Sequence, residues 1–283
     1  MDWSRSKTIF IVVFLILDVF LISLYLNRHL EAQQVKVPGE KTIEARLKED
    51  NITFNILPTH METASYISAK VANFNEEDLQ FENFQNITIK NNHKLFVTFK
   101  DPVKLKNITD QMSFNEFLKN NVYNGASYSL WKVDEENQTA TFFQRIDQNI
   151  IYYNIHGVVT IYWNEDQEVT MYEQTMLMDF EKFEEVENLL SPLQIIQILY
   201  ARNLLKPESH ITEMNIGYST LVQLTQTQVF VPTWEVRVKT ADGTEEEFFV
   251  NAVEGKVIDV QSDLTVDEDE TEELEKLTEI EEE

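Results

Sequence analysis

The 283-residue sequence has no cysteine, only six glycines, and fewer than half as many basic as acidic residues. Without cysteine the chain has no disulfide, no thiolate metal site and no cysteine nucleophile. Its few glycines form no loop of the kind that cradles phosphates. The formal net charge of −26 argues against nucleic-acid binding, which needs clustered Lys and Arg side chains. What remains, with 43% hydrophobic residues, is the composition of a folded protein.

Motifs for catalysis and metal binding are absent as well. The five histidines are scattered, with no pair at metal-binding spacing and no HExxH motif. No G-x-S-x-G motif marks a serine nucleophile. The acid clusters at residues 75–78 and 134–137 lack the EF-hand pattern, so we interpret them as solvated turns. We therefore expect no catalytic residue, no metal and no cofactor, and a protein that is not an enzyme.

A long hydrophobic run, IFIVVFLILDVFLISLYL, occupies residues 9–26. As a helix it would span about 27 Å, close to the roughly 30 Å hydrocarbon core of a bilayer. Trp3 and Tyr25 lie where interfacial anchors are expected. A cleaved signal peptide would have a shorter run and a small-residue cleavage site, neither of which is present. We predict an uncleaved transmembrane signal anchor over residues 9–27.

The charges around this run predict its orientation. Arg5 and Lys7 precede it, against Arg28 after it. By the positive-inside rule, this slight bias places residues 1–8 in the cytoplasm. We therefore expect a single-pass protein of the cell membrane, with residues 28–40 as a linker and the bulk of the chain extracytoplasmic.

Asp18 stands near the centre of the hydrophobic run. A charged Asp there costs roughly 2.5–3.5 kcal/mol, which a long run of Ile, Leu, Val and Phe can absorb. Two interpretations are open, a protonated Asp facing lipid or a hydrogen bond to a polar group on another transmembrane helix. The run has no Gly, so close small-residue packing cannot form and we favour the hydrogen bond. On a 3.6-residue period the predicted partner contact comprises Asp18, Phe14, Leu15, Leu21, Ile22 and Tyr25.

The rest of the chain shows mostly strand patterns, with three helical segments. Helices are predicted at 41–49, at 113–123 with Ser113 and Glu116 as a capping box, and at 181–205 with Pro192 restarting the helix after Ser191. Hairpin turns are predicted at Asn91-Asn92 and Asp242-Gly243. Strands are predicted at 51–57, 64–74, 87–90, 94–100, 127–133, 139–146, 158–163, 168–177, 211–224, 229–238, 245–252 and 256–260.

These patterns predict an α+β fold, mostly antiparallel, with two subdomains. We place subdomain 1 at residues 41–155 and subdomain 2 at 156–262, followed by a disordered acidic tail at 263–283. Trp131, Trp163, Trp234 and the pair Tyr152-Tyr153 fall mainly in strands. We interpret them as core or cross-strand residues, with a ligand groove as the alternative.

Several segments together resemble the YycI family. They are MDWSRSKTIFI at the start, LLSPLQIIQILY (189–200), GYSTLVQL (217–224), PTWEVRV (232–238) and FFVNAVEGKVI (248–258). The resemblance covers residues 1 to about 262 and excludes the acidic tail.

The resemblance implies a regulator of Gram-positive Firmicutes with a two-domain α+β extracytoplasmic part. Such proteins act with a similar partner, YycH, on the essential sensor histidine kinase WalK, also called YycG, which drives a two-component system controlling cell-wall metabolism. Contacts with the kinase run largely through transmembrane helices, which on this chain means the run at 9–26. The alternative is an anchored extracytoplasmic module that binds a ligand or, like PepSY domains, modulates a protease.

Overall fold

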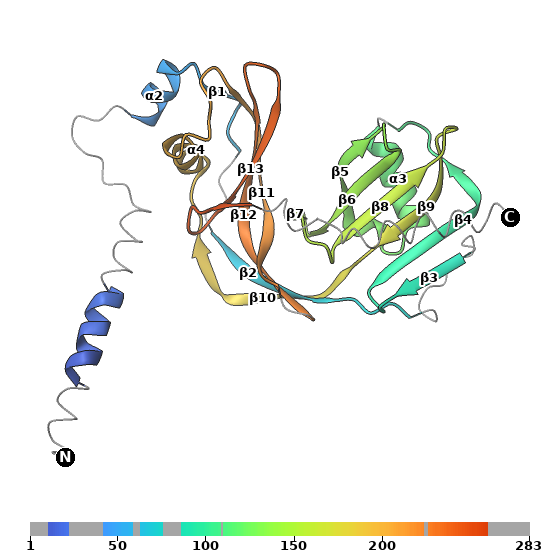
Figure 1. Cartoon of the computed structure of the whole chain (residues 1–283), viewed down its shortest axis with the longest axis horizontal. Coiled ribbons are helices and arrows are strands. Elements are labelled where there is room, and N and C mark those ends of the chain that lie inside the picture. Colours follow the sequence, from blue (N-terminus) through green and yellow to red (C-terminus); the bar gives the residue numbers. More distant parts are fainter. Residues whose placement is uncertain are drawn as a thin grey trace, which may run out of the picture. The chain divides into compact units, whose positions relative to one another are not determined.

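The computed structural model describes residues 11–22, 42–58, 63–75, 86–108, 110–223 and 226–259 (Figure 1). The chain divides after Asn51 into two compact units. The first unit contains a helix over residues 11–22 and α2 (Ile43–Glu49), which confirms the helix predicted at 41–49. Thr42 caps α2, because its side chain accepts a hydrogen bond from the backbone N–H of Ala45.

The second unit contains all the described strands, and it confirms the predicted α+β class with mostly antiparallel pairing. Among these strands the only parallel pairings are those of β1 (Thr53–Phe54) and β7 (Asn149–Tyr152), each with β11 (His210–Gln223). The strands form a smaller and a larger sheet, which β7 (Asn149–Tyr152) connects by pairing with a strand of each.

The smaller sheet has six antiparallel strands in the order β5-β6-β8-β9-β4-β3. These are β3 (Asn86–Lys90), β4 (Lys94–Lys104), β5 (Tyr128–Asp134), β6 (Thr139–Ile146), β8 (Val158–Trp163) and β9 (Glu168–Gln174). The turn between β3 and β4 has both Asn91 and Asn92 at positive φ, as the predicted hairpin requires. A short 3-10 helix, η2 (Gly125–Ser127), precedes β5.

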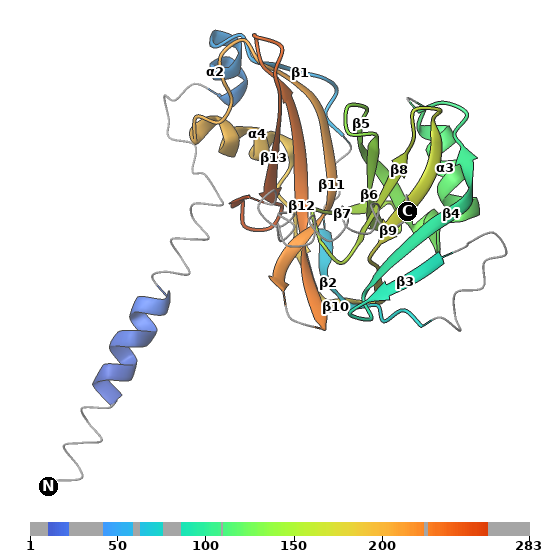
Figure 2. The ribbon, with the colours of Figure 1, turned by 45° about the vertical axis from the view of Figure 1, so that its right-hand side comes forward.

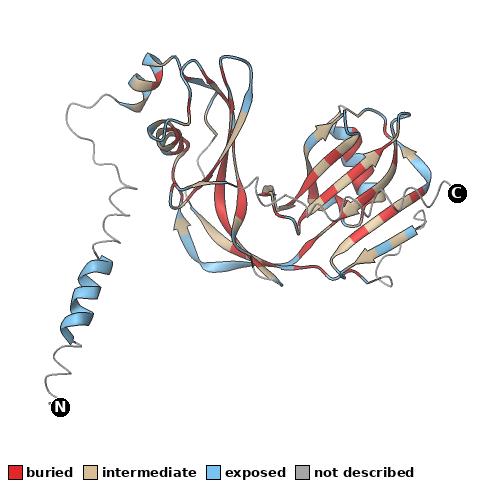
Figure 3. Cartoon of the chain, viewed as in Figure 1, coloured by how far each residue is buried: buried red, intermediate tan, exposed pale blue. Residues whose placement is uncertain are grey.

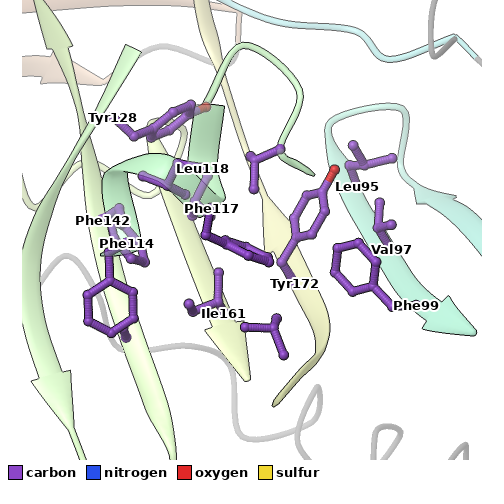
Figure 4. Close-up of a cluster of buried hydrophobic side chains, with 14 of the residues drawn as sticks. Leu95, Val97, Phe99, Phe114, Phe117, Leu118, Tyr128, Phe142, Ile161 and Tyr172 are labelled. Atoms are coloured by element: carbon purple, nitrogen blue, oxygen red, sulfur yellow. The ribbon is translucent and has the colours of Figure 1, made fainter. Parts of the chain in front are cut away.

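Helix α3 (Gln111–Asn121) covers the smaller sheet and closes its core (Figure 4). Phe114, Phe117 and Leu118 of the helix are at most 4% exposed and pack with strand residues such as Phe142 and Tyr172. The predicted capping box is wrong at this helix. Asp110 is the N-cap and accepts from the backbone N–H of Met112, whereas Ser113 is buried inside the first turn.

In the larger sheet β11 and β12 pair along most of their length (Figure 2). The other edge of β12 pairs with β2 near its start and with β13 towards its end, and β10 lies beyond β2. The strands are β1 (Thr53–Phe54), β2 (Thr63–Val71), β10 (Leu177–Asn188), β11 (His210–Gln223), β12 (Thr227–Lys239), β13 (Glu245–Asn251) and β14 (Val257–Ile258).

The helix predicted at 181–205 is only half correct. Residues 181–188 belong to strand β10, and α4 (Pro192–Ala201) begins where Ser191 and Pro192 were predicted to restart a helix. The hydroxyl of Ser191 accepts from the backbone N–H of Gln194, and the Gln194 side chain accepts from the backbone N–H of Ser191. Trp234 of β12 donates its indole N–H to the carbonyl of Leu190, just before this helix.

Strand pairing crosses the predicted subdomain boundary near residue 155. β8 and β9 follow that boundary but pair with β6 and β4, whereas β2 precedes it but pairs with β10 and β12. The smaller sheet is therefore inserted, along the chain, between β2 and β10. The predicted acidic tail, residues 263–283, lies outside the described residues.

Candidate functional site

The helix over residues 11–22 carries most of the predicted partner contact. Asp18 is exposed, and so are the four apolar members described with it: Phe14 (60%), Leu15 (60%), Leu21 (52%) and Ile22 (58%). Spacings of three and four residues place these side chains on the same side as Asp18. Residues on the opposite side are equally apolar and exposed, as Ile16 shows at 62%. A helix that is apolar all round needs a nonpolar environment or a partner to cover it.

The predicted anchor is longer than this helix. Residues 9–10 and 23–27, including Tyr25, lie outside the described residues. Within the described part of the chain, no helix is long and apolar enough to cross a membrane. The anchor, its orientation and the role of Asp18 stay predictions.

A buried carboxylate lies where the larger sheet meets β7. Glu235 of β12 is 1% exposed, and its Oε1 accepts from Nε of Arg237 at 2.5 Å. Its Oε2 accepts from the hydroxyl of Tyr152 at 3.3 Å and from Nδ2 of Asn215 at 3.2 Å. The carboxylate is thus held by three donors from three strands, as a buried charge requires.

This network shifts the protonation equilibria of its members. Burial raises the pKa of Glu235, and the charge of Arg237 opposes that rise. Burial and the neighbouring Glu235 carboxylate raise the pKa of Tyr152 well above 10.0. Burial raises the pKa of Tyr153 to about 12, with the Glu247 carboxylate adding to the rise. All three groups therefore keep their protons to higher pH than they would in water.

Aromatic side chains from both sheets surround the network. Trp131 and Phe143 come from the smaller sheet, Phe249 comes from β13, and Tyr153 follows β7, with neighbouring ring centroids 5.0–5.6 Å apart. The guanidinium of Arg237 lies 4.8 Å from the Trp131 ring centroid, within cation–π distance. Tyr152, Trp163 and Trp234 are at most 5% exposed, in agreement with the prediction that the aromatics are core or cross-strand residues.

Further hydrogen bonds join the two sheets here, and we call this region, made up of the Glu235 network and the aromatic side chains around it, the junction. The hydroxyl of Tyr153 accepts from the indole N–H of Trp131 and donates to Glu247 of β13 at 3.2 Å. The buried side chain of Gln144 in β6 makes two 2.8 Å hydrogen bonds to the backbone of Leu177 in β10. Satisfied polar networks of this kind fix one arrangement of the elements they join. The sequence did not indicate this junction.

The described residues offer little chemistry beyond packing. No group of three His, Cys, Asp or Glu side chains among them could hold a metal ion. Asp134 is held within its own turn by both the backbone and side-chain N–H groups of Asn137, as a solvated turn predicts. His210 is half-buried and hydrogen-bonds Thr53 through Nδ1 and Asn55 through Nε2. Residues 76–78, His29 and His60 lie outside the described residues.

A hollow beside the junction is the place where the predicted alternative, a ligand groove lined by aromatic residues, would lie. It has a volume of about 340 Å³ and lies against β7 and the middle of β11. Its lining includes Ile150, Tyr152, Met214, Asn215, Ile216 and Trp234. A mostly apolar lining with a few polar groups is typical of small-molecule sites, although this hollow is at the small end of their range.

Comparison with known families decides the affiliation of the chain. The family model described as YycI protein matches residues 31–253. The chain belongs to the YycI family. The match includes the junction and both sheets apart from β14, whereas the helix over residues 11–22 and the opening MDWSRSKTIFI precede it. No curated protein matches the sequence.

Solved structures that this family member resembles are distant. An uncharacterized protein from Eubacterium rectale has 11% identity and a TM-score of 0.42, covering 74% of this chain and 91% of that chain. The YpeB C-terminal domain of Bacillus megaterium has 14% identity and a TM-score of 0.39, covering 68% and 87%. YycH from Bacillus subtilis has 11% identity and a TM-score of 0.37, covering 68% of this chain but only 53% of YycH.

Proposed function

We propose that this chain is a non-enzymatic regulator of an essential two-component system that controls cell-wall metabolism. Membership of the YycI family is the observation that carries the proposal. In this proposal the chain acts with a YycH-like partner on the sensor histidine kinase, WalK or YycG, through contacts between transmembrane helices. Its N-terminus lies in the cytoplasm and its two sheets lie outside the cell membrane.

The exposed apolar helix supports a membrane contact as the mechanism. A kinase that moves between signalling states displaces its helices slightly, and a helix that packs better against one state stabilises that state. A hydrogen bond from Asp18 within the membrane would contribute about 0.6–2 kcal/mol. That free energy changes a two-state ratio by about 3- to 30-fold.

The absence of cysteine makes a direct crosslinking test possible. A Cys introduced at Phe14 or Leu21 would be unique in the chain, as would a control Cys at Ile16 or Phe20 on the opposite side of the helix. Paired with single Cys residues in the kinase helices, Phe14→Cys and Leu21→Cys should form disulfide-linked products in membranes. The control positions should form few. Equal yields from both sides, or no product at all, would refute the proposed contact face.

Substitution of Asp18 tests the polar contact itself. Asp18→Leu should change expression of a kinase-dependent reporter by about 3- to 30-fold, the ratio expected for one intramembrane hydrogen bond. Asp18→Asn keeps hydrogen-bonding capacity and should stay close to wild type. If Asp18→Leu leaves both the membrane complex and the reporter unchanged, Asp18 faces lipid and has no regulatory contact.

The hollow beside β7 favours one second candidate, an anchored module that binds a ligand or modulates a protease. In that case the two sheets alone would carry the function. Replacement of residues 9–27 by an unrelated membrane anchor would then preserve the phenotype, whereas the helix-contact proposal predicts its loss.

A further inference from the structure

Strand β10 has an unusual surface for a strand at the edge of a sheet. It is twelve residues long, about twice the usual length, and β2 is the one described strand that pairs with it. Residues 181–186 are all exposed, without the alternation of a strand that has one face packed on a core (Figure 3). This part of β10 therefore leaves both of its faces open.

Two apolar side chains stand in this exposed stretch. Phe183 is 46% exposed and Val186 is 57% exposed. The register places residues 183–185 opposite Tyr66 alone, because Lys182 is level with Ile67 and Val186 with Ser65. Such a bulge changes the direction in which the side chains point and interrupts the ladder of backbone hydrogen bonds between the two strands. It leaves a surface that a partner would recognise by side chains rather than by adding a long strand.

Acidic residues surround these apolar side chains. The strand contains five acids, Asp179, Glu181, Glu184, Glu185 and Glu187, against Lys182, which is a net charge of −4. Asp179 pairs with Lys70 and Lys182 pairs with Asp147, both at 3.1 Å. No described Lys or Arg forms an ion pair with the four glutamates.

Protection of a sheet edge explains the charges and the bulge, but not the exposed Phe and Val. Natural edges are guarded by charges and irregularities. A guarded edge has no need of large apolar side chains between its charges. Apolar anchors inside a charged rim are instead the composition of a protein-binding surface.

From this composition we propose that β10 docks a positively charged segment of another protein, which covers Phe183 and Val186 and pairs with the surrounding glutamates. The charge excludes the other occupants. A second copy would place a net charge of −4 against −4, and residues 267–283 of the same chain carry eleven acids and one Lys. An anionic lipid surface would be repelled as well. This proposal is independent of the helix contact described above.

Photo-crosslinking tests the surface in the full-length chain. With p-benzoylphenylalanine in place of Phe183, cells irradiated during growth should yield one discrete protein adduct. The crosslinked peptide should contain several Lys or Arg residues. The same reagent in place of Met112, which is 76% exposed in α3, is the control for nonspecific capture and should not yield that adduct.

Charge variants complete the test. Neutralising Glu181, Glu184, Glu185 and Glu187 to Gln should lower the adduct yield about tenfold, because opposite charges steer and hold such partners. The matched control neutralises Glu135, Glu136, Glu165 and Asp166, four exposed acids in the turns of the smaller sheet, and should leave the yield unchanged. The surface assignment is overturned by an adduct with a second copy, with lipid or with an acidic peptide. It is equally overturned by no adduct, or by equal losses in the two charge variants.

Discussion

Replacing Arg237 with Met would leave the Glu235 carboxylate buried without the guanidinium that now lies 2.5 Å from its Oε1. Removing one partner of a buried ion pair costs about 3–5 kcal/mol. The Arg237 side chain is 35% exposed whereas that of Glu235 is 2% exposed, so water screens part of the interaction. Tyr152 and Asn215 still donate to Oε2. We therefore expect a loss of about 2–4 kcal/mol in the free energy of unfolding.

Thermal unfolding of the full-length chain in nonionic detergent measures this loss. For a folded region of this size, about 2–4 kcal/mol corresponds to a decrease of about 4–16 °C in the unfolding midpoint. The matched control is the double variant Glu235→Gln, Arg237→Met. It loses the same contact between Arg237 and the Trp131 ring, but its residue 235 is neutral and still accepts from Tyr152 and Asn215. It should recover most of the stability.

The pH dependence gives a second, independent result. Burial raises the pKa of Glu235, and without Arg237 the pKa rises further. A group whose pKa is higher in the folded state adds stability below its ordinary value, here 4.5, and loses it as pH rises through the folded value. The stability of the Arg237→Met variant should therefore approach that of the wild type as pH falls from neutrality towards 4.5. Equal midpoints for the single and double variants, with no recovery at low pH, would refute the buried-charge argument.

Three further predictions concern the same fold. Gly217→Ala would place its Cβ 2.4 Å from Cε2 of Tyr152, and this overpacking should lower the free energy of unfolding by about 1–3 kcal/mol, measured by thermal unfolding. A variant that melts like wild type would contradict this tight packing and show that β7 can shift away. Ser191→Ala removes the capping box with Gln194 and should cost about 1 kcal/mol in urea unfolding, whereas Ser191→Thr should retain most of it; equal losses would contradict the cap. The pKa of Tyr153 is raised from 10.0 to about 12, so its contribution to stability is lost as pH rises through the higher value. Tyrosinate absorbance, titrated as the difference between wild type and Tyr153→Phe, measures this pKa. A midpoint near 10.0 would contradict the burial of Tyr153.

The sequence predicted most clearly the elements whose signals are local. The strands at 139–146 and 158–163 match β6 and β8, because both segments are short and rich in β-branched and aromatic residues. Ser191 and Pro192 located the start of α4, because a cap depends only on its own first turn. The hairpin turn at Asn91 and Asn92, which both have positive φ, was also predicted, because a tight turn depends only on its own residues.

The errors arose where structure depends on distant partners. Phe183, Val186, Leu189 and Leu190 recur at helical spacing, but the bulges of β10 remove the period-two pattern that would have marked a strand. The N-cap of α3 was misplaced by one turn, because Asp110 and Ser113 are both good capping residues. The junction could not have been predicted, since Tyr152 and Glu235 are 83 residues apart and meet only through sheet pairing.

The position of the smaller sheet along the chain has a consequence for how the family can vary. Val71 at the end of β2 and Leu177 at the start of β10 are level neighbours in an antiparallel pair. The segment of more than a hundred residues between them therefore leaves and re-enters the larger sheet at one place, as the loop of a hairpin does, and of its described strands only β7 returns to pair with β11. A segment with adjoining ends can be lengthened, shortened or exchanged without moving the strands that carry it. Sequence divergence among relatives should therefore accumulate as whole-segment changes between these two strands, limited mainly by β7, which pairs with β11, and by the side chains that face the junction.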